Sequence, residues 1–173
     1  LIAVLLNDGT GGLLPAVTYS MGAGSRPHSL VIADFNQDDK LDIAVADYGA
    51  NNVGIRLGTG NGTFPTVNTF ATGTGPHSIR TGDMNGDGRL DLALASHDSY
   101  GVTLLFGDGN GGFALAPRSP VIMKEGGHPH THGLLAGDLN GDGKPDLATV
   151  NSDDNDVSVA FGDGKGGFTR AAS

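Results

Sequence analysis

Apolar residues alternate with small or polar residues in several short segments of the chain. The alternation runs through residues 53–57, 102–106 and 157–161, and residues 2–6 repeat it at the beginning. A period of two is typical of β-strands that bury one face. No stretch of ten or more residues has the period of an α-helix. The pattern therefore predicts an all-β protein.

Two motifs recur in the same order along these segments. The first has the pattern Asp-x-Asn-x-Asp-x-x-x-Asp, is followed by an Ala-rich apolar segment, and lies within residues 33–45, 82–94 and 137–149. The second is a Gly-rich turn between two apolar residues, at residues 57–64, 106–113 and 161–168, with a weaker copy at 6–13. Recurrence at intervals of roughly 50 residues indicates a repeat protein.

Each complete repeat is expected to form four short strands. In the first one these are residues 30–33, residues 42–46, a third strand that ends at the Gly-rich turn, and residues 66–71. Four-stranded repeats of this length are typical of β-propeller blades. We divide the chain into a partial blade at 1–26 and blades at 27–75, 76–126 and 127–173, the last with an incomplete final strand. The extra residues of the third repeat, 117–132, are expected in the loop that enters the next blade.

About three and a half blades do not close a ring, because propellers have roughly four to eight. The chain is therefore expected to be part of a larger propeller. Unpaired strand edges promote aggregation. Neighbouring blades, from the same longer chain or from other copies, are expected to cover them. We do not expect this chain to be a closed monomer by itself.

Composition narrows the possible partners and chemistry. The chain has 173 residues, of which 30 are glycine and none is cysteine, so disulfides, Cys-bound zinc and thiol catalysis are excluded. Its net charge is −9, and no basic patch is visible, which argues against nucleic acid as a partner. No apolar run approaches the length of a membrane span, so membrane insertion is not expected.

The aspartate motif has the ligand pattern of a calcium loop. Side-chain oxygens at positions 1, 3, 5 and 9, with a backbone carbonyl at position 7, form the six- or seven-oxygen shell that Ca²⁺ prefers. The side-chain ligands predicted are Asp34, Asn36, Asp38 and Asp42, then Asp83, Asn85, Asp87 and Asp91, then Asp138, Asn140, Asp142 and Asp146. The carbonyl ligands predicted are those of Lys40, Arg89 and Lys144.

Other interpretations of these loops remain open. Asp and Gly also suit acidic β-turns that bind nothing, and Mg²⁺ takes oxygen ligands too, although it usually keeps several waters. The loops lack the Glu at position 12 that completes an EF-hand. Position 6 must turn sharply, which glycine allows at Gly88 and Gly143, whereas the first loop has Asp39 there and is expected to bind more weakly.

The paired motifs resemble FG-GAP/VCBS repeats, which occur in integrin α-subunit propellers and in many secreted bacterial proteins. Residues 83–91 and 106–113 carry the resemblance most clearly, and it covers almost the whole chain. The resemblance implies a propeller, usually of seven blades, with Ca²⁺ between the first two strands of a blade. Its implied location is extracellular or at the cell surface.

The expected function is that of a non-catalytic, calcium-stabilised propeller segment serving adhesion, ligand binding or assembly, with a protein or glycan as ligand. Family membership does not fix the activity. No Gly-x-Ser-x-Gly elbow is present. Glu125 is the only glutamate, which disfavours a glycosidase pair that includes Glu.

The histidines support an alternative function. His28, His77 and His132 each lie six residues before the leading Asp of a loop, where they would meet at the central channel of a propeller. His128, His130 and His132 alternate, so an extended segment would present them together as a transition-metal site. Such a site would belong to a metal-dependent extracellular enzyme or a lectin. The other interpretation is that the histidines fill ordinary strand-entry positions, as after Pro27 and Pro76, and His97 is given no role.

Overall fold

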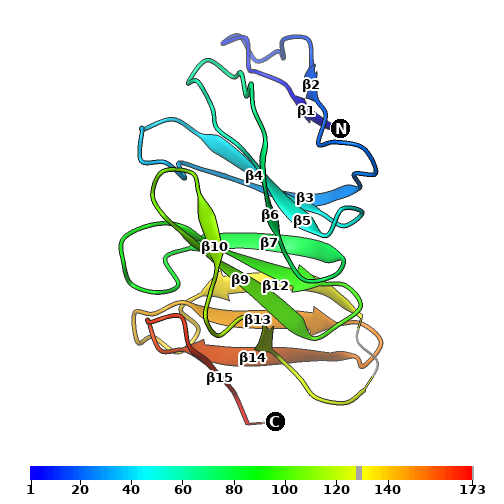
Figure 1. Ribbon diagram of the computed structural model, residues 1–173, viewed down its shortest axis with the longest axis vertical. Coiled ribbons are helices and arrows are strands. Elements are labelled where there is room, and N and C mark those ends of the chain that lie inside the picture. Colours follow the sequence, from blue (N-terminus) through cyan, green and yellow to red (C-terminus); the bar gives the residue numbers. More distant parts are fainter. Residues whose placement is uncertain (128–129, 173) are drawn as a thin grey trace.

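The computed structural model consists of β-strands and the turns that join them (Figure 1). It describes residues 1–127 and 130–172. Within these ranges the chain forms no helix, so the predicted all-β class is confirmed. Accordingly, none of the described residues belongs to a helix with the length and apolar character needed to cross a membrane.

Three antiparallel sheets follow one another along the chain, and each is built from consecutive strands. The first contains β3 (Pro27–Ala33), β4 (Asp42–Asp47), β5 (Asn52–Arg56) and β6 (Asn68–Ala71). The second contains β7 (Pro76–Gly82), β8 (Asp91–Ser96), β9 (Gly101–Gly107), β10 (Phe113–Leu115) and β11 (Val121–Ile122). The third contains β12 (Thr131–Gly137), β13 (Asp146–Asn151), β14 (Asp156–Gly162) and β15 (Phe168–Arg170). Four strands in this meander order are the form of a propeller blade.

A two-stranded sheet precedes them. Its strands are β1 (Ile2–Val4) and β2 (Val17–Tyr19), which pair antiparallel. The weak Gly-rich copy at residues 6–13 lies between them, and an isolated bridge joins Asn7 to Leu13. In the complete sheets the Gly-rich turn joins the third and fourth strands. The sheet of β1 and β2 therefore corresponds to the outer half of a blade.

The strands depart from the sequence expectation in several places; β6, for example, begins at Asn68 instead of residue 66. β3 begins at Pro27 instead of residue 30, because Pro27 pairs with Asp47 beyond a bulge in the register. The extra residues of the third repeat do not all lie in a loop. Val121 and Ile122 pair with Val102 and Gly101 of β9, as β11, so they extend the edge of the second sheet.

The core lies between successive sheets. β8 is buried on both faces, and its residues alternate between two clusters. Leu92 and Leu94 pack with the first sheet, whereas Ala93 and Ala95 pack toward the third. A third cluster around Met21 joins the two-stranded sheet to the first full sheet. The sheets are thus stacked face to face, as the blades of a propeller are (Figure 1).

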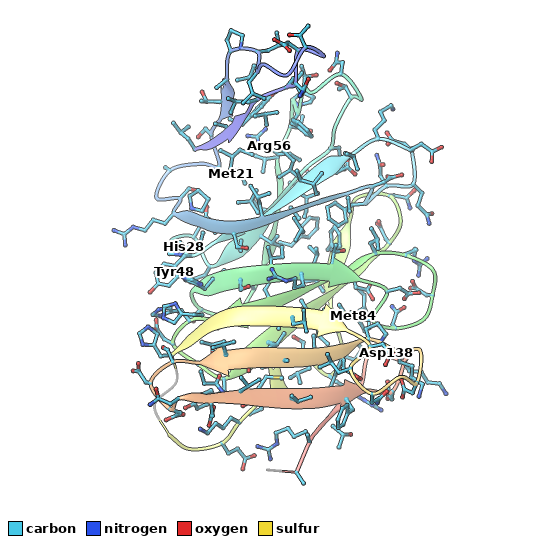
Figure 2. The ribbon with its side chains drawn as sticks, turned by 180° about the vertical axis from the view of Figure 1, so that it is seen from behind. Met21, His28, Tyr48, Arg56, Met84 and Asp138 are labelled. Carbon is cyan, nitrogen blue, oxygen red and sulfur yellow. The ribbon has the colours of Figure 1, made fainter. Side chains whose placement is uncertain are left out.

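The first strands of neighbouring sheets lie side by side, since β7 contacts both β3 and β12. Each begins close to a histidine and ends at an aspartate loop. A strand of seven residues is about 20 Å long, which separates the two kinds of site. In Figure 2, His28 and Tyr48 accordingly lie at one edge of the stack and Asp138 at the other. The fold therefore has a histidine end and an aspartate end.

Both outer faces of the three full sheets carry exposed apolar side chains, although the two-stranded sheet covers part of the first of these faces. Leu30 is 46% exposed, whereas Ile79 and Leu134, at the same position of the next repeats, are 0% and 3% exposed because the preceding sheet covers them. On the opposite face, Val157 is 61% exposed, while its equivalent Val102 is fully buried. Inside the stack, the equivalent face of each inner sheet is covered by the neighbouring blade.

Candidate metal centres

The leading aspartate of each loop organises the backbone around it. Asp83 Oδ1 accepts hydrogen bonds from the backbone N–H groups of Gly86 (2.7 Å) and Asp87 (3.1 Å), and Oδ2 accepts one from Gly88 (2.9 Å). Asp138 makes the same set in the third loop, and the N–H of Gly143 holds its pKa below the usual value. The carboxylate therefore remains ionised inside a preformed loop.

Positions 3 and 5 add oxygen groups to the same loop. Asn85 Oδ1 accepts from the N–H of Asp87 at 2.9 Å, and Asp87 Oδ1 accepts from the N–H of Arg89 at 2.9 Å. In the third loop, the N–H of Asp142 bonds to Asn140 Oδ1 at 2.8 Å. Within each loop, the side chains predicted as ligands at these positions thus lie in one tight turn, and all of them present oxygen.

The sequence suggested a backbone carbonyl ligand at position 7. In the structure, the basic side chain at this position also forms an ion pair within the loop. The distance between its basic side chain and the position-5 carboxylate is 2.9 Å for Lys40 and Asp38, 2.6 Å for Arg89 and Asp87, and 3.2 Å for Lys144 and Asp142. The bond from Lys40 lowers the pKa of Asp38. These pairs are exposed to solvent, so each contributes little to stability. A divalent cation would outcompete them for the carboxylate.

The aspartate at position 9 is fully buried in every loop. Asp91 Oδ2 accepts from the N–H of Met84 at 2.8 Å, and its Oδ1 accepts from the N–H of Gly107 at 2.9 Å. The equivalent donors are Phe35 and Gly58 for Asp42, at 2.9 and 2.7 Å, and Leu139 and Gly162 for Asp146, both at 2.9 Å. This carboxylate joins the aspartate loop to the Gly-rich turn, a role that the sequence did not suggest. Its assignment as a cation ligand stays a prediction.

The charge on the buried carboxylates favours a bound cation. Burial raises the pKa of Asp91 to about 6, and the nearby charges of Asp87 and Asp83 add to the shift. Burial likewise raises the pKa of Asp42. A raised carboxyl pKa means that the surroundings do not fully offset the hydration that the ionised form has lost. The donor set is all oxygen and the charge is in excess, so the residues present fit a hard divalent cation such as Ca²⁺.

The first loop keeps the shape of the other two without their glycines. Gly86 and Gly88 both have φ of 79°, and the first loop reproduces these angles with Gln37 at 60° and Asp39 at 61°. The left-handed geometry predicted for Asp39 is confirmed, and Gln37 is a second strained position. A non-glycine residue in this region costs roughly 1–2 kcal/mol. This cost favours the expectation of a weaker first site.

The repeats match a known family of proteins. A model of that family, the FG-GAP-like repeat, matches residues 2–45, 34–94 and 83–149. The chain belongs to the FG-GAP-like repeat family. The second and third matches each run from one aspartate loop through the next, so each includes the Gly-rich turn between them.

Solved structures support the same fold for these FG-GAP repeats. One is that of an Agrocybe aegerita lectin, described for specific recognition of non-reducing terminal N-acetylglucosamine. It is 23% identical to this chain, with a TM-score of 0.60 over 96% of the chain. The chain spans 44% of the length of the lectin. No curated protein sequence matches the chain.

Each FG-GAP turn also contacts the preceding repeat. The N–H of Gly111 donates to the carbonyl of Phe35 at 3.2 Å, and the N–H of Gly166 donates to that of Met84 at 3.0 Å. Gly166 has φ of 78°, and a Cβ there would lie 2.3 Å from the Phe106 ring, so a side chain at this position would strain the backbone and displace the ring. The turn therefore rests on the aspartate loop of the repeat before it. The glycine at the sixth position of each turn was the sequence signal for this contact.

The histidines gather at the opposite end. His28 and His77 have ring centroids 4.6 Å apart, and those of His77 and His132 are 5.3 Å apart, as expected from their equivalent positions. His97 also belongs to this group, with centroids 4.3 Å from His130 and 5.2 Å from His132. The sequence did not indicate that His97 lies in this group.

The location of His97 explains why it was missed. It follows β8, in the turn toward β9, and that turn lies at the same end as the start of β12. His128, which the sequence grouped with His130 and His132, lies outside the described residues. Burial lowers the pKa of His77, and the neighbouring His28, His97 and His132 contribute. The neutral form of the His77 imidazole is therefore favoured.

Proposed function

We propose that the chain is a calcium-stabilised, non-catalytic propeller segment of a secreted or cell-surface protein, serving adhesion, ligand binding or assembly. The observation that supports it best is the buried aspartate at position 9. It ties each candidate calcium loop to a Gly-rich turn within its own sheet. Filling the loops with calcium would therefore stabilise blades and the contacts between them.

An extracellular location agrees with this role. Sites in extracellular modules typically bind Ca²⁺ with dissociation constants of about 10⁻⁴ to 10⁻³ M. Calcium outside cells is abundant enough to fill them, whereas cytosolic calcium is not. The exposed loops and the partly strained first loop are suited to affinities in this range.

Neighbouring blades are the proposed partners of the two outer faces. Leu30 and Ile32 on one face, and Val150 and Val157 on the other, are about half exposed or more. The covered equivalents inside the stack indicate the kind of surface that fits there: an apolar sheet face of the same repeat type. It would come from the same longer chain or from another copy.

Calcium titration tests the proposal directly. Isothermal titration calorimetry of the chain, freed of metal, should give three bound ions, two of similar affinity and one weaker. Asp142→Ala should remove one of the two stronger sites, because the loop loses a carboxylate ligand. Asp39→Gly should strengthen the weaker site, because it relieves the left-handed backbone conformation in the first loop.

A matched variant separates this prediction from general damage. Gly143→Asp introduces into the third loop the residue that the first loop has, at a position where a Cβ meets no atom. It should weaken one strong site by about as much as Asp39→Gly strengthens the weak one. A wild-type chain that binds no calcium at millimolar concentration would refute the proposal.

Carbohydrate binding is a second candidate function. The similar lectin gives the fold alone, but a groove of about 690 Å³ beside the histidine end has suitable chemistry. Thr74, Asp98, Ser99 and Lys124 line it and offer hydroxyl and charged groups that can bond to sugar hydroxyls. Titration of the calcium-loaded chain with N-acetylglucosamine is the test. Binding that Asp98→Ala abolishes would support this candidate, and no heat at millimolar sugar would exclude that sugar as its ligand.

A further inference from the structure

Three imidazoles from two sheets converge at the histidine end. One ring nitrogen from each of His97, His130 and His132 lies within 4.8 Å of the other two. We propose that these three residues form a site for a single Zn²⁺ ion, separate from the calcium loops. Neutral imidazole is a common zinc ligand, and three protein ligands with one open position are a standard zinc arrangement.

Carboxylates orient two of the three rings. His97 Nδ1 lies 2.7 Å from Asp98 Oδ1, and His130 Nδ1 lies 2.9 Å from Asp153 Oδ1. A carboxylate that accepts the Nδ1 proton fixes the ring and leaves the lone pair on Nε2 for a metal. Histidines that bind metals in proteins nearly always have such a partner. The pairing occurs twice here, which distinguishes this group from histidines that merely stack.

Backbone hydrogen bonds fix the segment of His130 and His132 to the segment of His97 and to its own sheet. The N–H of Thr131 donates to the carbonyl of His97 at 3.0 Å, and the N–H of Ser152 donates to that of His130 at 3.0 Å. The Thr131 hydroxyl donates to the carbonyl of Ser99 at 3.1 Å. The junction of the second and third sheets therefore fixes the positions of the three ligands. A metal bound there would link two blades.

The site differs from the calcium loops in chemistry and in place. Its ligands are nitrogen atoms, which favour zinc and its neighbours over calcium. It lies at the opposite end of strands about 20 Å long. His132 is exposed, so water or an anionic group can reach the site from its side.

Zinc titration in the presence of millimolar calcium tests the proposal, because calcium then occupies the aspartate loops. Isothermal titration calorimetry should give one zinc ion per chain, with micromolar or tighter affinity. His132→Ala should weaken binding by about 100-fold or more, and Asp98→Asn by about 10- to 100-fold. His132 is exposed and its replacement should leave the fold intact; circular dichroism checks this.

His28→Ala is the matched control. His28 stacks on His77, with ring centroids 4.6 Å apart, but it is not one of the three proposed ligands. Zinc binding by this variant should equal that of the wild type. The proposal is overturned if zinc does not bind in calcium, if excess calcium displaces it, or if His28→Ala weakens it as much as His132→Ala does.

Discussion

Removing calcium with EGTA should lower the melting temperature of this chain by at least about 10 °C. A ligand that binds only the folded state stabilises it by about 2.7 kcal/mol per site at a concentration 100 times its dissociation constant, which is about 10 mM calcium for a dissociation constant of about 10⁻⁴ M. For a domain of this size, 1 kcal/mol corresponds to a shift of about 2–4 °C. Two well-filled sites are therefore enough for the expected shift, and a third adds to it.

The measurement is a thermal melt followed by circular dichroism, first in about 10 mM calcium and then in excess EGTA. Returning calcium should restore the transition, whereas the same concentration of magnesium should restore little of it, because Mg²⁺ holds its waters and prefers compact octahedral sites. Asp142→Ala should show a smaller difference between the two conditions. Identical melting curves with and without chelator would contradict calcium stabilisation.

Much of the fold could be predicted from the sequence because its signals are local and repeated. The alternation at residues 53–57 and 102–106 marks strands β5 and β9, and the two motifs mark the turns on either side. Where strand pairing depends on partners far along the chain, local pattern was insufficient. Pro27 joins β3 only because Asp47 lies across from it. Val121 joins the second sheet through Val102, to which no local signal pointed.

The candidate sites divide in the same way. The ligand set of the aspartate loops lies within nine residues, so spacing alone could indicate it. The histidine site joins His97 to His130 and His132 across two sheets, and only the stacking of blades brings them together. The contact between Gly111 and the carbonyl of Phe35 is equally a property of the stack. A site built from residues of different repeats has no fixed spacing within one repeat. The sequence pattern therefore could not indicate it.

The buried aspartate at position 9 gives the second large expected effect. In calcium at pH 7, Asp91→Ala should destabilise the chain by about 4 kcal/mol or more. The substitution removes a cation ligand and also leaves the N–H groups of Met84 and Gly107 buried without their acceptor. Each unsatisfied buried group costs about 1–3 kcal/mol. The melting temperature should fall by about 8–16 °C.

Asp87→Ala is the control, because Asp87 is a predicted ligand of the same loop but is more exposed than Asp91. In calcium, Asp87→Ala should lose only the stabilisation that the bound ion provides. Asp91→Ala should therefore destabilise the chain more. In EGTA the gap should narrow. Burial raises the pKa of Asp91 to about 6, so without a cation its charge at pH 7 is itself unfavourable and its removal offsets part of the loss. Equal destabilisation by the two variants in calcium would mean that the buried carboxylate acts as a ligand alone and that its bonds to the Gly-rich turn carry no stability.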